Sequence, residues 1–303
     1  MTARLMRPWN WRICCDNILT HMVFYKYHGA GNDFLIADGR DENIDLTAQQ
    51  IASVCDRHTG AGADGVMVLE RDPELDFRMR YYNSDGSGGM MCGNGGRCIV
   101  AFAADLGFTH FSFNAPDGQH IAELIPGTEV PAAFSKTPRV VRLKMRDVSG
   151  AEPYGADWFL DTGTRHLVHF VDDVADYDVT GEGRRLRHDP RFAPQGVNVN
   201  FVQVNVPGQE ITVRTFEKGV EDETLACGTG IVASSLATWL ATRLAARQST
   251  RCDVLESCQI TVHARISDLS VTFTPSLHPA PSASRFTDIW LQGPAAFICR
   301  VEI

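Results

Sequence analysis

Two cysteines of this chain stand in nearly the same local sequence. Cys92 is followed by Gly-Asn-Gly and Cys227 by Gly-Thr-Gly, and each string leads into an apolar, alanine-rich run with helical spacing, over residues 97–106 and 231–246. A thiol just before a helix faces unpaired backbone N–H groups and the positive end of the helix dipole, so we expect its thiolate to be stabilised. The same N–H groups can bind a carboxylate. Two such thiols predict a matched pair of proton-transfer groups facing one substrate.

The similarity between the two halves of the chain extends beyond the cysteines. Residues 29–38 loosely parallel residues 162–172, and residues 62–69 loosely parallel residues 196–204, in the same order ahead of each cysteine. The offset between the cysteines, 227 − 92 = 135 residues, is the size of a domain and much too long for a solenoid unit. We therefore expect two related domains that each contribute one thiol.

Composition narrows the class of protein. A length of 303 residues allows two domains that each bury a core. The net charge of −9, without a basic run, argues against a nucleic-acid or anionic-membrane partner, and no apolar stretch reaches the roughly 20 residues that span a bilayer. Nine irregularly spaced cysteines favour reduced thiols in the cytoplasm. The spacing of Cys92 and Cys98 matches no usual zinc pattern, so no metal site is expected.

Strand patterns outnumber helical patterns along the chain. Helices are predicted only at 47–57, with Thr47 as its cap, and after the two cysteines. The expected strands are 22–27, 34–38, 65–70, 77–82, 140–145, 157–160, 167–171, 199–206, 210–216, 258–264, 269–274 and 295–302, with loops at 126–139 and 275–285. This balance predicts an α+β fold of two similar domains, each a curved mixed sheet around a central helix, related by pseudo-two-fold symmetry.

Polar residues gather around glycines at the expected strand ends. They are Asn32, Asp33, Asn83, Asn94, Asn198, Glu217 and Lys218. Asn-Gly strings are also common in ordinary turns, so each residue taken singly is a weak candidate. Beside the paired cysteines, however, the set predicts a site for a polar small molecule.

The chain resembles the diaminopimelate epimerases. The matching segments, which extend over nearly the whole chain from Met22, are residues 27–34, 62–65, 82–86, 91–98, 198–201 and 213–230. The resemblance implies an isomerase that converts LL-diaminopimelate to meso-diaminopimelate, for lysine and peptidoglycan precursor synthesis, and that forms a homodimer. It also implies one domain of residues 22–145 completed by a last strand at 293–303, and a second domain of residues 146–292. Residues 1–21 would be an extension or a misassigned start.

The resemblance assigns roles residue by residue. Cys92 and Cys227 match the catalytic cysteines, and family usage suggests that Cys227 accepts the proton and Cys92 donates one in the LL-to-meso direction. The helix-terminal groups that hold the reacting carboxylate match Gly93, Asn94, Gly228 and Thr229. Positions that bind the rest of the substrate match Asn32, Asn83, Thr164, Asn198, Glu217 and Lys218. His166 and Glu217 match polar residues that support the cysteines.

Three positions depart from the family pattern. Lys218 stands where many members have arginine, which keeps the charge but loses the bidentate fork. Thr164 begins a Thr-Arg-His string in place of Asn-Pro-His, so an amide becomes a hydroxyl, and Gly65 stands where some members have glutamine. These departures concern substrate specificity rather than proton transfer.

A two-thiol mechanism requires no cofactor, and the sequence contains no cofactor motif. The string at 29–32 lacks the third glycine and the following helix of a dinucleotide loop. Epimerisation needs a base on one face of the α-carbon and an acid on the other, which two thiols supply. The alternatives are another two-cysteine amino-acid racemase and, from a different class, a thiol redox sensor.

Overall fold

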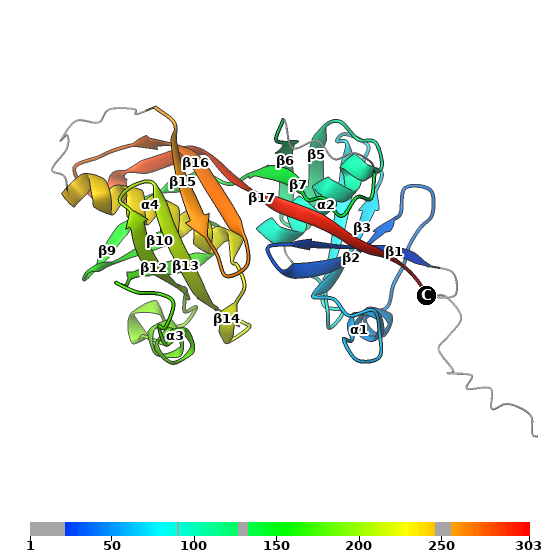
Figure 1. The fold of residues 1–303 in the computed structure, drawn as a ribbon, viewed down its shortest axis with the longest axis horizontal. Helices are drawn as coiled ribbons and strands as arrows, with labels where there is room; N and C mark the ends of the chain where they lie inside the picture. The colour runs from blue at the N-terminus through cyan, green and yellow to red at the C-terminus, as the bar shows by residue number, and fades with distance from the viewer. Residues whose placement is uncertain (1–21, 90, 127–132, 246–255) are drawn as a thin grey trace, which may run out of the picture.

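The computed structural model describes residues 22–89, 91–126, 133–245 and 256–303, which form two similar halves (Figure 1). Residues 1–21, expected to be an extension, lie outside the described residues. In these ranges, no helix is long and apolar enough to cross a membrane.

The first half is a strongly curved mixed sheet with one helix inside it. Its elements are β1 (Val23–Gly29), β2 (Asn32–Asp38), α1 (Ala48–Cys55), β3 (Gly65–Glu70), β4 (Phe77–Asn83), α2 (Gly93–Asp105), β5 (Phe111–Ala115), β6 (Gly118–Leu124) and β7 (Arg139–Lys144). Successive strand pairs run antiparallel, parallel, antiparallel, parallel, antiparallel and antiparallel.

The second half repeats this order. Its elements are β10 (Asp157–Asp161), β11 (Arg165–Phe170), α3 (Val179–Arg187), β12 (Asn198–Val206), β13 (Glu210–Glu217), β14 (Asp222–Thr224), α4 (Gly228–Ala245), β15 (Cys258–His263), β16 (Asp268–Ser276) and β17 (Arg285–Glu302). The main pairs from β10 to β17 again run antiparallel, parallel, antiparallel, parallel, antiparallel and antiparallel. The predicted α+β repeat of two similar domains is confirmed. Short elements flank it: β8 (Val148–Ser149), β9 (Glu152–Tyr154), η1 (Pro190–Phe192) and η2 (Pro281–Ala283).

Strand β17 extends through both halves, as Figure 1 shows. Its residues 285–292 pair with β16, residues 290–295 pair with β7, and residues 296–302 pair with β1. The final residues of the chain therefore close the sheet of the first half. Through the backbone hydrogen bonds of this shared strand, the strands of both halves form one continuous 17-stranded sheet.

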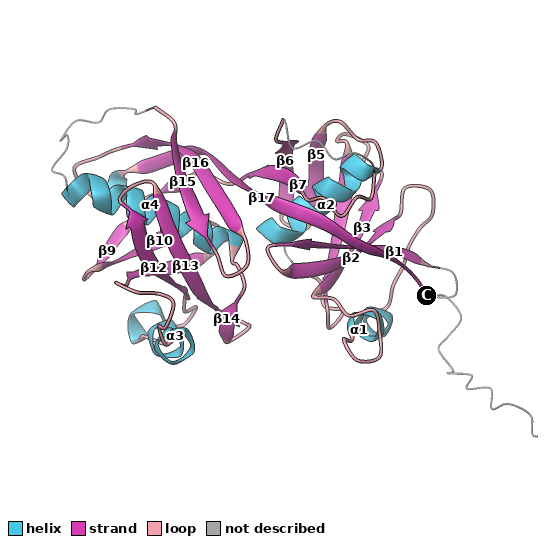
Figure 2. Ribbon diagram, in the orientation of Figure 1, coloured by secondary structure: helices cyan, strands magenta, loops and turns pink. Residues whose placement is uncertain are grey.

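Helices α2 and α4 lie inside their sheets (Figure 2). Residues 93–103 of α2 are buried, and so are residue 228 and residues 230–240 of α4. A helix that carries mostly apolar or small residues on all sides is typically buried in a core. Because each core helix begins directly after one of the two cysteines, packing of the core also places the thiols.

The sequence patterns missed one helix and several strands. Helix α3 carries two glycines and three arginines, so its helical pattern is weak. It forms because the Asp178 side chain accepts a hydrogen bond from the Gly181 N–H at 2.8 Å and because Val179 and Leu186 are buried in a tertiary cluster. The hairpin β5–β6 and strand β14 were not predicted, and residues 275–285, expected as a loop, hold the end of β16, η2 and the start of β17.

Candidate active site

Each cysteine occupies the N-terminal end of a core helix, as the sequence predicts. Cys92 is the N-cap of α2, and its sulfur accepts a hydrogen bond from the Gly95 N–H at 3.3 Å. The carbonyl of Cys227 accepts the first main-chain hydrogen bond of α4 from Ile231 at 2.9 Å. The Cys227 sulfur lies 3.5 Å from the hydroxyl of Thr229. Cys92 is exposed, whereas Cys227 is buried, and both thiols are free.

The two helix N-termini meet at a pair of glycines. A β-carbon on Gly93 would lie 3.6 Å from the Cα of Gly228, and one on Gly228 would lie 3.4 Å from the Cα of Gly93. The same β-carbons would lie 3.0 and 3.1 Å from Cδ2 of Leu291. A larger residue at either position would require the end of the Leu291 side chain to shift by a few tenths of an ångström, which glycine does not. Two positive helix ends thus converge at one place, which favours an anionic ligand there.

The pKa values of the thiols differ from the sequence-based expectation. Burial raises the pKa of Cys227 to about 12, against the lowering effect of the Thr229 hydroxyl and the Gly230 N–H. Cys92 is exposed as a residue, yet protein atoms around its thiol desolvate it, and this also raises its pKa. The Glu217 carboxylate raises both further. In the ligand-free protein, desolvation therefore outweighs the helix ends, and both thiols are protonated at neutral pH.

Asn94 ties the two halves together. Its Nδ2 donates to Oδ1 of Asn32 at 2.6 Å and to the carbonyl of Ala226, in the other half, at 3.0 Å. Its Oδ1 accepts a hydrogen bond from Arg97 at 2.7 Å, and Asn32 also donates to Asp64 at 3.1 Å. Both N–H groups of the Asn94 amide are thus engaged within the protein. Donation to an anionic ligand falls to the main-chain N–H groups of the helix ends.

A second polar cluster surrounds Cys227. Nε2 of His166 lies 2.8 Å from the hydroxyl of Thr164 and 3.0 Å from that of Thr229, and the two hydroxyls lie 3.0 Å apart. Asn198 contacts the Thr164 hydroxyl at 3.5 Å and accepts the main-chain N–H of Lys218 at 2.8 Å. His166 is fully buried, and burial lowers its pKa to about 3, so its imidazole is neutral at working pH.

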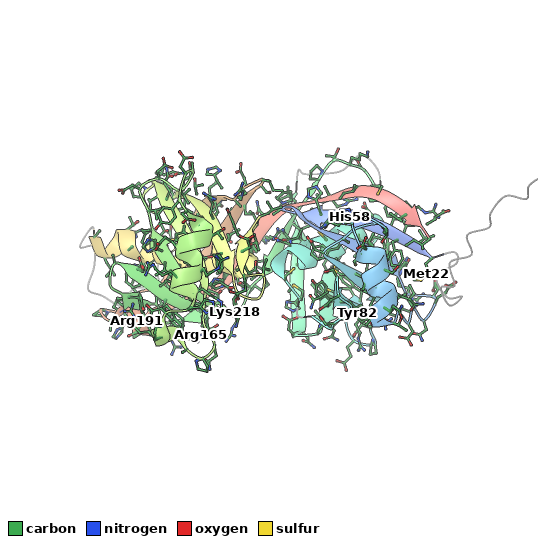
Figure 3. The ribbon with its side chains drawn as sticks, turned by 90° about the horizontal axis from the view of Figure 1, so that it is seen from below. Met22, His58, Tyr82, Arg165, Arg191 and Lys218 are labelled. Atoms are coloured by element: carbon green, nitrogen blue, oxygen red, sulfur yellow. The ribbon has the colours of Figure 1, made fainter. Side chains whose placement is uncertain are left out.

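The remaining predicted residues are less tightly joined to these clusters. Asn83 ends β4 and donates to Ser87 at 3.0 Å, without a hydrogen bond to another predicted site residue in the described ranges. Lys218 is exposed and lies toward the middle of the molecule (Figure 3). Glu217 is half-buried, and burial raises its pKa. A β-carbon on Gly65 would lie 2.6 Å from the Tyr82 carbonyl, so β3 and β4 pack too closely at this position for a larger residue such as glutamine.

Two residues near the site had no role in the sequence-based prediction. Arg97 is fully buried, and the described residues supply it with no carboxylate partner; it donates to the Gly93 carbonyl at 3.2 Å and to Asn94. Asn200 is fully buried beside His166. The alternation of Asn198 and Asn200 with Val199 and Phe201 places both amides on one face of β12, which is a signal that the sequence does contain.

The buried imidazole makes stability depend on pH. An unfolded histidine takes up a proton near pH 6.5, whereas folded His166 stays neutral down to about pH 3, so the unfolded state binds more protons between these values. The stabilisation is complete above pH 6.5 and is lost as the pH falls. We expect the free energy of unfolding to fall by about 2 kcal/mol more in wild type than in His166→Gln when the pH is lowered from 7 to 5. Urea unfolding of both proteins at both pH values measures this; equal losses would contradict it.

Comparison with known proteins gives a consistent family. The family model described as diaminopimelate epimerase matches residues 24–127 and 158–269. A diaminopimelate epimerase of Flavobacterium psychrophilum is 38% identical over 288 residues, which cover 93% of this chain and 100% of that protein. One from Chlorobaculum tepidum is 44% identical over 213 residues, covering 69% of this chain and 80% of that protein.

Solved structures of more distant proteins share the fold. A phenazine biosynthesis protein of Bacillus anthracis superposes with a TM-score of 0.63 at 12% identity, covering 94% of this chain and 99% of that one. A hydroxyproline epimerase from Agrobacterium vitis gives 0.55 at 15% identity, covering 93% and 91%. At these identities the likeness extends to the architecture alone.

Proposed function

The chain belongs to the diaminopimelate epimerase family, and we propose that it interconverts LL- and meso-diaminopimelate by a two-thiol mechanism. This isomerase activity supplies a precursor for lysine and peptidoglycan synthesis. The observation that carries the proposal is the meeting of two cysteine-capped helix N-termini at Gly93 and Gly228.

The arrangement fits proton transfer at a carbon beside a carboxylate. With the α-carboxylate held at the convergent helix ends, the α-carbon lies between a thiol from each half. One sulfur acts as thiolate and takes the α-proton, and the freed electron pair delocalises into the carboxylate. The other thiol gives its proton to the opposite face, which inverts the centre and leaves a thiolate. Main-chain N–H groups stabilise the developing charge better than water does.

The raised thiol pKa values suit this task. A thiolate whose conjugate acid has a high pKa is a stronger base toward a weakly acidic C–H bond. The cost is a smaller thiolate population, which the Gly95 N–H and Arg97 offset at Cys92 and which Thr229 offsets at Cys227. His166 acts on Cys227 through its contact with the Thr229 hydroxyl, and the Glu217 carboxylate acts on both sulfurs by raising their pKa values.

Recognition of the distal, non-reacting amino-acid end is assigned to a separate set of polar groups. They are Asn32, Asn83, Asn198, Glu217 and Lys218. Asn32 accepts a hydrogen bond from Asn94 in the first half, and Asn198 donates one to Thr164 in the polar cluster around Cys227. We assign the reacting carboxylate to the N–H groups at Gly93, Asn94, Gly228 and Thr229.

The proposal extends to domain limits and setting. We place one domain at residues 22–145 plus 293–303 and the other at 146–292, supported by the pairing of β17 residues 296–302 with β1. We assign the enzyme to the cytoplasm, where reducing conditions keep both thiols active. From its family we also propose that it forms a homodimer. Its partner is the small-molecule substrate, with no cofactor required by this mechanism.

The test uses reduced, purified protein and LL-diaminopimelate without added cofactor. We expect meso product to form and, in deuterated water, the α-hydrogen to exchange with solvent. Proline, tested in parallel, should be inert. If proline is racemised while meso product fails to form, the substrate assignment is wrong and a related two-cysteine racemase is indicated. If neither compound exchanges its α-hydrogen, the redox-sensor alternative gains support.

A further inference from the structure

Asn200 lies in a fixed orientation next to His166. Its Nδ2 donates to the carbonyl of Leu167 at 3.2 Å, and its Oδ1 accepts a hydrogen bond from the hydroxyl of Thr215 at 3.0 Å. A main-chain carbonyl can only accept, so this contact identifies which end of the amide is nitrogen. Asn200 and Thr215 are directly paired across β12 and β13, and both are buried.

This orientation determines the tautomer of His166. The second N–H of the Asn200 amide points at Nδ1 of His166, 3.1 Å away. Nδ1 must therefore be the acceptor nitrogen of the neutral imidazole, and the proton resides on Nε2. Gly230 in the first turn of α4 packs closely against both residues, because a β-carbon there would lie 2.2 Å from Oδ1 of Asn200 and 3.3 Å from Cε1 of His166.

The tautomer in turn orients the hydroxyls beside Cys227. An Nε2–H group donates and cannot accept, and its one hydrogen has the hydroxyl oxygens of Thr164 and Thr229 within reach, 2.8 and 3.0 Å away, with Thr164 the nearer. The opposite tautomer would offer a lone pair and would draw a hydroxyl hydrogen toward the imidazole. With Nε2 donating to Thr164, the Thr164 hydroxyl can donate to Thr229, 3.0 Å away, and the hydrogen of Thr229 is then free to point at the Cys227 sulfur, 3.5 Å away.

We propose that Asn200 is a positioning residue for the reaction at Cys227, because its amide holds His166 as the Nε2–H tautomer and so turns the Thr229 hydroxyl toward the sulfur. The role of Asn200 in catalysis rests on the proposed function, whereas the His166 tautomer and the orientation of the Thr229 hydroxyl are properties of the ligand-free protein. A hydroxyl that donates to sulfur stabilises the thiolate relative to the thiol. The other titratable groups that act on Cys227 are Glu217 on β13 and Cys92 before α2, and both disfavour its thiolate.

The direct test is the tautomer itself. The chain contains ten histidines, and ¹⁵N-histidine labelling with long-range ¹H–¹⁵N correlation distinguishes Nδ1–H from Nε2–H for each. The His166 signals are identified by their loss in His166→Gln. We expect the Nε2–H pattern in wild type and its loss, or a mixture, in Asn200→Leu. A wild-type Nδ1–H pattern would overturn the proposal without any variant of Asn200.

The second test follows the effect to the sulfur. At about pH 9 the alkylation rate of Cys227 by iodoacetamide is proportional to its small thiolate fraction, and mass spectrometry separates it from Cys92 in the same sample. We expect Asn200→Leu to slow alkylation of Cys227 by several-fold to about tenfold while Cys92 changes less than twofold. Asn205→Leu, on the same strand with its amide bonded to Thr212 at 2.9 Å, is the matched control and should behave as wild type.

A double variant decides whether Asn200 acts through Thr229. Thr229→Val removes the last donor, so adding Asn200→Leu to it should slow Cys227 no further. Additive effects would overturn the relay. Both tests omit substrate, so a protein that shows the relay but does not epimerise diaminopimelate would refute the proposed function and leave this inference standing.

Discussion

Replacing Cys227 with alanine should lower kcat for epimerisation at least about 10³-fold, and Cys92→Ala should do the same. Each proton-transfer group contributes about 10²–10⁴-fold, and inversion requires one on each face of the α-carbon. Neither thiol can substitute for the other, because each is fixed at the N-terminus of its own core helix. The measurement is meso-diaminopimelate formed from the LL isomer under reducing conditions.

A single remaining thiol should still reveal itself by exchange. It can remove a proton and return one to the same face, so each alanine variant should exchange the α-hydrogen of one isomer with deuterated water without inverting it. Cys299→Ala removes an exposed thiol from β17, away from the helix ends, and serves as the matched control with wild-type activity. Inversion by Cys227→Ala within tenfold of wild type would show that the second thiol is not a proton donor or acceptor.

Arg97→Met should lower kcat about 10²-fold while leaving the free energy of unfolding within about 2 kcal/mol of wild type. Arg97 is a fully buried cation without a carboxylate partner in the described ranges, and it lies one turn into α2, donating back to the Gly93 carbonyl. Burial raises the pKa of Cys92, and the Gly95 N–H and the Arg97 charge are the leading groups that oppose this. Removing the charge should therefore reduce the Cys92 thiolate and weaken retention of the substrate carboxylate.

The small stability change follows from two opposing effects. Methionine leaves Oδ1 of Asn94 without its donor, which costs about 1–3 kcal/mol, but it also removes the desolvation cost of a buried charge. Arg139→Met is the contrasting control, because Arg139 neutralises the buried carboxylate of Asp105. That variant should lose about 3–5 kcal/mol of stability with Cys92 reactivity unchanged.

Urea unfolding and the alkylation rate of Cys92 separate the two outcomes. The Arg97 prediction is that stability is kept while both kcat and the Cys92 alkylation rate fall. If Arg97→Met were as active as wild type, the Arg97 side chain would contribute only to packing and its charge would have no role in catalysis.

Much of the fold followed from local patterns. The cap at Thr47, with its reciprocal contacts to Gln50, and the starts of α2 and α4 depend on residues within one helical turn, and the structure confirms them. Helix α3 could not be predicted in this way, because its glycines oppose helix formation and its buried contacts come from distant strands. Local propensity does not register such tertiary contacts.

By itself the sequence determined the chemistry of the site: two thiols, each before a glycine-rich helix start, in a repeat of 135 residues. These features depend on neighbouring residues, and a linear chain displays them. Only the tertiary structure decided which groups meet, since Asn94 and Ala226 are 132 residues apart and Asn200 and His166 are 34 apart. It also decided the protonation of the site. A helix end favours a thiolate locally, but desolvation depends on every atom packed around the sulfur, and here that packing raises both thiol pKa values.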